Sequence, residues 1–148
     1  MTCVDGIHKP RNYTVSASLA TLTQEGLVLK KDSGNTLTLI TAKGDAAVAV
    51  LDQAFVDATQ TAKTTVSGDK VGVFFLGSGA IVKVASVTTI TYTTGCLVYL
   101  ADDVDGMVNI TGATSTPIGH YVGDGEATTA SGDLVDVILD MPIDATLV

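Results

Sequence analysis

The sequence predicts an all-β fold, a compact β-barrel or β-sandwich of short antiparallel strands with an extended N-terminal arm. Three observations predict it. Apolar residues make up 46% of the 148 residues and charged residues 16%, so the chain has enough apolar surface to form a core. Val, Ala, Leu, Ile and Thr are abundant beside 15 Gly, which is typical of strands and tight turns. Short apolar runs recur along the chain, each bounded by Gly, Asp or Thr.

The first 20 residues predict the arm, because they alternate poorly and contain Gly6, Pro10 and Asn12. Residues 21–148 contain no linker-like stretch, and we expect them to form a single β domain. The chain starts without the charged-then-apolar order of a signal peptide, and no apolar run reaches the roughly 20 residues that cross a bilayer. We therefore expect a soluble protein without its own export signal.

The first elements after the arm are two predicted hairpins with an ambiguous segment between them. Residues 25–29 and 36–41 flank a polar turn and predict a β-hairpin. Residues 45–58 are Ala-rich, which suits a helix, but they also alternate, and we favour a strand followed by a loop. Residues 71–76 and 80–84 flank Gly77-Ser78-Gly79, which predicts a second hairpin rather than part of a dinucleotide fingerprint.

The second half of the chain predicts five more short strands, which favours a barrel or sandwich. They are residues 87–92, 96–100, 107–110, 118–122 and 134–139.

One phrase occurs three times, a Ser/Thr-Gly pair followed by alternating apolar residues, at residues 67–73, 94–100 and 131–137. The Gly supplies a turn conformation with positive φ, and the residues after it point alternately in and out. The phrase therefore predicts the start of a strand. Its unequal spacing argues against a solenoid.

The succession of these phrases resembles a known family. Gly-Cys-Leu-Val-Tyr-Leu at 95–100, Gly-Met-Val at 106–108, Pro-Ile-Gly-His-Tyr-Val-Gly at 117–123 and Ser-Gly-Asp-Leu-Val-Asp-Val-Ile-Leu at 131–139 are similar to the capsid decoration, or cement, proteins of tailed bacterial and archaeal viruses. The resemblance covers roughly residues 22–142. The Ala-rich residues 45–58 and the long arm depart from the family pattern.

The resemblance implies a viral structural protein, made in the host cytoplasm and located in the virion on the outer capsid surface. There it would bind the major capsid protein as a homotrimer and stabilise the shell. Independently of the resemblance, the residues argue against contact with nucleic acid or membrane: residues 44–148 contain three Lys/Arg and thirteen Asp/Glu, and such an acidic body repels both.

The arm is the candidate attachment segment, since residues 1–43 contain five Lys/Arg and three Asp/Glu. We expect Lys9 and Arg11 to meet acidic groups and Ile7, Tyr13 and Val15 to cover apolar surface of the capsid or of a neighbouring copy. Deleting residues 1–19 should then weaken attachment and leave the isolated fold intact.

Asp102, Asp103 and Asp105 before Gly106 resemble a fragment of a calcium loop, but Ala101 and Gly112 occupy its first and last positions. A solvated acidic turn is favoured, so no metal site is assigned. The alternative function that keeps this feature is a β-sandwich carbohydrate-binding or adhesive module with calcium at the acidic turn.

No residue pattern predicts an enzyme or a cofactor. Cys3 and Cys96 have neither a CxxC partner nor a nearby His, and Cys96 is expected to pack as a small apolar residue. His8 and His120 have no Ser and Asp at a spacing that indicates a catalytic triad. We therefore expect a non-enzymatic protein without a cofactor.

Overall fold

The structure, a computed structural model, describes residues 11–15, 25–32, 36–52, 70–102, 106–112 and 114–142. This part of the chain contains twelve strands and no helix, which confirms the all-β prediction. The strands are β1 (Arg11–Val15), β2 (Val28–Lys31), β3 (Thr36–Leu39), β4 (Ala47–Leu51), β5 (Lys70–Phe75), β6 (Ile81–Ser86), β7 (Thr91–Tyr92), β8 (Leu97–Leu100), β9 (Val108–Asn109), β10 (Pro117–Tyr121), β11 (Glu126–Ala127) and β12 (Asp133–Ile138).

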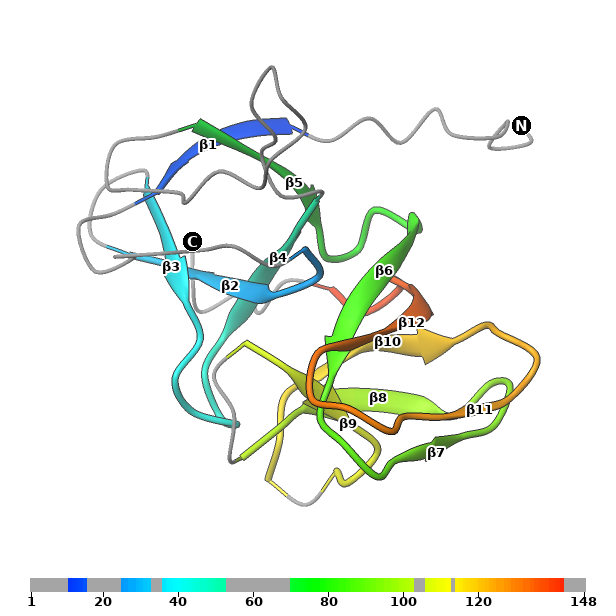
Figure 1. The fold of residues 1–148 in the computed structure, drawn as a ribbon. Coiled ribbons are helices and arrows are strands. Elements are labelled where there is room, and N and C mark those ends of the chain that lie inside the picture. Colours follow the sequence, from blue (N-terminus) through cyan, green and yellow to red (C-terminus); the bar gives the residue numbers. More distant parts are fainter. Residues whose placement is uncertain are drawn as a thin grey trace, which may run out of the picture.

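Ten of these strands form two closed five-stranded barrels (Figure 1). The first barrel has the strand order β1-β3-β2-β4-β5, and the second has the order β10-β12-β6-β9-β8. The two remaining strands, β7 and β11, pair as a small antiparallel ribbon beside the second barrel. The predicted barrel architecture is therefore confirmed, and the chain builds it twice.

The two barrels share one topology. In each, the first strand lies parallel to the third, as β1 beside β3 and β6 beside β9, and the other pairs are antiparallel. The second strand pairs with the third and the fourth, and the fifth pairs with the fourth and the first. Strands β1 to β5 of the first barrel thus correspond in order to β6, β8, β9, β10 and β12 of the second.

The correspondence extends to the register of single residues. Residue pairs of the first barrel have equivalent pairs in the second: Val28–Val50 matches Leu97–His120, Val50–Phe74 matches His120–Ile138, Lys31–Leu37 matches Leu100–Val108, and Tyr13–Val71 matches Val84–Val135. Both fourth strands also carry a bulge at the same step, where the register skips Val48 in β4 and Ile118 in β10. The chain folds as two copies of one five-stranded unit.

The barrels are packed against each other through a common core. Inward-facing residues of the first barrel, such as Leu29 and Val73, form one apolar cluster. Val28 and Val50, which alternate with them, belong instead to the cluster that fills the second barrel around Val135. The outer face of β2 and β4 is therefore covered by the second barrel.

Gly26 lies at a close contact between the two barrels. Its φ is +79°, and its carbonyl oxygen accepts a hydrogen bond of 2.9 Å from the amide of Ala85. A Cβ at Gly26 would lie 2.7 Å from that amide nitrogen and 2.9 Å from a methyl group of Leu134. Only glycine satisfies both the backbone conformation and this close approach.

Several sequence-based expectations for the elements are confirmed. β2 and β3 form the predicted antiparallel hairpin. Ala47–Leu51 is a strand, β4, as favoured for the Ala-rich segment, whereas residues 53–58 of that segment lie outside the described residues. β8, β9, β10 and β12 occur in the four last segments for which strands were predicted.

The predicted hairpin across Gly77-Ser78-Gly79 is wrong. β5 pairs with β1 and β4, and β6 pairs with β12 and β9, so this turn connects the two barrels. Gly77 and Gly79 have φ values of +75° and +73°, which glycine adopts more readily than other residues in such a turn. In the described part of the chain, β5 and β6 pair only with strands of their own barrels.

Candidate functional site

Five residues of the arm were expected to bind a partner, and three of them lie on β1. Arg11, Tyr13 and Val15 are strand positions of the first barrel, while Ile7 and Lys9 lie outside the described residues. β1 pairs with β5 on one side and β3 on the other, with Tyr13 opposite Val71. The expected boundary at residue 20 also lies outside the described residues.

Of the three aspartates in the acidic turn, only Asp102 belongs to the described residues. Asp102 is exposed and forms an ion pair of 2.7 Å with Lys43, which reaches it from the first barrel. Asp103 and Asp105 lie outside the described residues. A cluster of three or more His, Cys, Asp or Glu side chains that could hold a metal ion does not occur among the residues that the structure describes.

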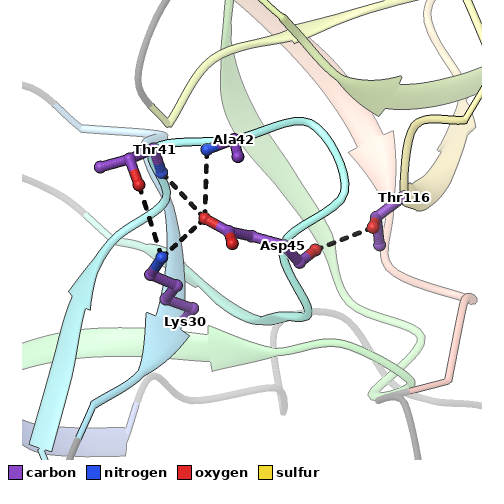
Figure 2. Close-up of polar contacts among 5 residues, drawn as sticks. All are labelled: Lys30, Thr41, Ala42, Asp45 and Thr116. Carbon is purple, nitrogen blue, oxygen red and sulfur yellow. Dashed lines mark hydrogen bonds and ion pairs between the residues drawn. The ribbon is translucent and has the colours of Figure 1, made fainter.

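Asp45 lies in the turn between β3 and β4, at the junction between the barrels (Figure 2). Its carboxylate accepts hydrogen bonds from Lys30 Nζ at 2.7 Å and from the amides of Thr41 and Ala42 at 3.1 Å each. Its carbonyl oxygen accepts a bond of 2.8 Å from the hydroxyl of Thr116 in the second barrel. Asp45 thus fixes the turn between β3 and β4 and joins it to the other barrel.

Burial by itself would raise the pKa of Asp45, but the hydrogen bonds from Lys30 and from the Thr41 and Ala42 amides stabilise the carboxylate more. The pKa of Asp45 is therefore lowered from its ordinary value. The Asp45 carboxylate has a structural role, since its hydrogen-bond donors all belong to this chain.

Asp133, the acidic residue of the third repeated phrase, has a similar role. Its carboxylate accepts bonds from the amides of Ala130 at 2.9 Å and Thr129 at 2.7 Å, which lower its pKa. The carboxylate thereby closes the turn that leads into β12. The phrase starts a strand, as predicted, and its Asp stabilises the turn.

Two tyrosines fill the interior of the second barrel. Tyr92 and Tyr121 are each 1% exposed, and their ring centroids lie 5.2 Å apart. The hydroxyls of Tyr92 and Ser86 are hydrogen-bonded at 2.7 Å, and the Tyr121 hydroxyl donates to Glu126 at 3.0 Å. Burial raises the pKa of Tyr92 to about 12. Both hydroxyls are hydrogen-bonded within the chain.

The outer face of the second barrel is the surface best suited to a partner. We define it by five side chains on its strands or next to them, which are Ile81, Leu97, His120, Val122 and Ile138. The register places Leu97, His120, Ile138 and Ile81 side by side across β8, β10, β12 and β6. Three apolar side chains and His120 therefore form a row across four strands.

This face exposes apolar surface next to charged groups. Ile81 is 63% exposed and Val122 is 37% exposed; Ile110 is the other large exposed apolar side chain among the described residues. His120 Nδ1 lies 2.7 Å from Asp140 Oδ2, and Lys83 forms an ion pair of 2.8 Å with Asp136. Exposed apolar side chains next to charged and hydrogen-bonded polar groups are typical of a protein-binding surface.

Sequence reasoning missed this face, although a signal for it was present. In Asp136-Val137-Ile138-Leu139 the core residues Val137 and Leu139 alternate with an outward position, and that position holds Ile rather than a polar residue. An apolar residue at an outward strand position indicates a covered surface.

The comparisons with known proteins give no family for the chain. No protein-family model matches the sequence, and a search of curated proteins finds no significant match. No helix that is long and apolar enough to span a membrane occurs in the described part of the chain.

Proposed function

We propose that this chain is a capsid decoration protein of a tailed virus, which binds the outer surface of the major capsid protein shell as a trimer and stabilises it. The observation that carries the proposal is the succession of four phrases that resembles this family. In the structure these phrases supply β8, β9, β10 and β12, four of the five strands of one closed barrel. The resemblance therefore follows one structural unit.

The chemistry of the described side chains also favours binding over catalysis. Asp45, Asp133 and the two buried tyrosines are used to hold turns and the barrel interior. The outer face of the second barrel, by contrast, leaves apolar side chains in contact with water, where burial against a partner would be favourable. A binding role uses this surface.

Undecorated capsids of the virus that encodes the chain provide the test. The purified protein should sediment with them in saturable, stoichiometric amounts, and decorated shells should release their DNA at a higher temperature than bare shells. A control uses the same capsids with the protein heat-denatured and clarified. Absence of co-sedimentation at concentrations far above that of the capsid sites would refute the proposal.

A further inference from the structure

We propose that the outer face of the second barrel binds the first barrel of a second copy of this chain, so that copies associate head to tail. The inference rests on the self-association in the proposed function and identifies the surface that makes it. The internal duplication carries it, because the structure shows what covers one of two equivalent faces.

In the first barrel this face is covered. Val28 and Val50 are 0% exposed, although they point away from the interior of their own barrel. Phe74, their neighbour in the register, is partly buried and packs against the same cluster. What covers them is the second barrel, a unit with the same topology.

In the second barrel the equivalent face is uncovered. Leu97, His120 and Ile138 occupy the positions of Val28, Val50 and Phe74 and are all partly exposed. Ile81 lies beside Ile138 and extends the row. Because an apolar face of this unit is covered by a like unit within the chain, a barrel from a second copy is the occupant with the matching shape.

The turn glycines show the same difference between the barrels. Gly26 and Gly95 precede the equivalent strands β2 and β8, have φ values of +79° and +83°, and donate to equivalent carbonyl oxygens, those of Leu51 and Tyr121. Gly26 is enclosed by Ala85 and Leu134 of the second barrel, whereas a Cβ at Gly95 would meet no atom within 4 Å. Gly95 thus has room for a neighbour of the kind that Gly26 already has.

The same equivalence identifies the surface that the second copy offers. Ala85, which contacts Gly26, corresponds in the register to Thr14 on β1. The two contacting surfaces differ, so the contact is heterologous, and three copies can close it into a ring.

Light scattering after size-exclusion chromatography tests the surface. The wild-type chain should elute with a mass of three times 15.1 kDa, and Ile81→Asp and Val122→Asp should each elute as monomers. Ile110→Asp is the matched control, because Ile110 is 39% exposed but lies outside the defined face; it should retain the wild-type mass. Circular dichroism verifies that each variant is folded.

Mixing two variants tests the head-to-tail arrangement. Thr14→Glu removes the acceptor surface and keeps the outer face, whereas Ile81→Asp does the reverse, so an equimolar mixture of the two monomeric variants should form a dimer. Thr91→Glu, at an exposed position of β7, is the control and should stay trimeric. A wild-type chain that is monomeric at every concentration, folded face variants that keep the wild-type mass, or a mixture that stays monomeric would overturn the inference.

Capsid co-sedimentation of the same proteins separates this inference from the proposed function. A trimer that depends on Ile81 but never binds capsids leaves the inference standing and refutes the function. A wild-type chain that binds capsids while Ile81→Asp and Val122→Asp keep the wild-type mass leaves the function standing and refutes the inference.

Discussion

At the scale of single residues, the Asp45 carboxylate is the polar group that holds the turn between β3 and β4. The carboxylate accepts hydrogen bonds from a lysine and two backbone amides, and the carbonyl oxygen of Asp45 accepts one from a hydroxyl of the other barrel. Hydrogen bonds to a charged group each contribute about 1.5 to 3 kcal/mol, so Asp45→Ala should lower the free energy of unfolding by about 2 kcal/mol in urea titrations. Asp102→Ala removes only the exposed ion pair with Lys43 and should cost under about 1 kcal/mol. Equal losses would contradict the role of Asp45.

The lowered pKa of Asp45 also predicts how stability changes with pH. A carboxyl whose pKa is lower in the folded than in the unfolded chain stabilises the fold above its ordinary value of 3.8, and this contribution is lost as the pH falls through the folded pKa. Asp45→Asn should therefore lose stability at pH 7 and show a shallower further loss below pH 4 than the wild type. Asp133, whose pKa is also lowered, should leave a residual acid sensitivity in this variant. Parallel curves would contradict the prediction.

Tyr92 predicts the opposite behaviour in alkali. Its pKa of about 12 lies above the ordinary value of 10, so it contributes stability that is complete below pH 10 and is lost as the pH rises towards 12. Tyr92→Phe should cost about 1 kcal/mol at neutral pH through the lost bond to Ser86, and it should flatten the stability curve between pH 10 and 12. Tyr99→Phe, at a partly exposed position, is the control. A Tyr99→Phe curve as flat as that of Tyr92→Phe would contradict the assignment.

At the scale of elements, β1 decides how far the N-terminus can be shortened without opening the first barrel. It closes the first barrel between β3 and β5, so deleting residues 1–15 should expose two strand edges and lower the midpoint of thermal unfolding strongly. Deleting residues 1–10 keeps β1 and should leave the midpoint nearly unchanged. The earlier expectation that residues 1–19 are dispensable for the fold therefore has to be tested with the shorter deletion, after which capsid binding reports on Ile7 and Lys9. Equal midpoints for the two truncated chains would show that β1 is not needed to close the barrel.

Most of the strands could be predicted from the sequence, although β1, in the expected arm, and β11 were not. The division of the strands between the two barrels could not be predicted. Alternation and turn glycines indicate each strand on its own, and they predicted β2, β3, β8 and β12 near their observed positions. Pairing depends on contacts distant in the sequence. The turn at Gly77-Ser78-Gly79 has the composition of a hairpin, yet it joins two barrels. The feature that decides this is the closure of each barrel, which no local pattern contains.

The duplication escaped sequence reasoning because equivalent core positions keep only their apolar character. Leu29 corresponds to Val98, and Leu51 corresponds to Tyr121. The Ser-Gly-Asp phrases at residues 67–73 and 131–137 keep their letters, and they lead into the equivalent strands β5 and β12. Barrel interiors accept such exchanges when total volume is preserved. The outer face of the second barrel was missed for a related reason, since a strand's outward side is defined only by its neighbours.

At the scale of the whole molecule, the duplication allows one position to be compared in two surroundings. Val28 and Leu97 are equivalent, but Val28 is 0% exposed in the core shared by the two barrels and Leu97 is partly exposed. Val28→Ala should lower the free energy of unfolding by about 2 kcal/mol, from lost burial and the cavity left behind. Leu97→Ala should cost less in the monomer, although it removes a larger side chain.

Concentration then distinguishes the monomer from the assembled chain. Measured in dilute Ile81→Asp monomers, Leu97→Ala should be nearly neutral; measured in the wild-type oligomer, its cost should rise towards that of Val28→Ala, because a second copy would then bury Leu97 as the second barrel buries Val28. The cost of Val28→Ala should be the same in both backgrounds, since its cover is part of the same chain. A Leu97→Ala cost that is equally small in both would place the self-association surface elsewhere on the molecule.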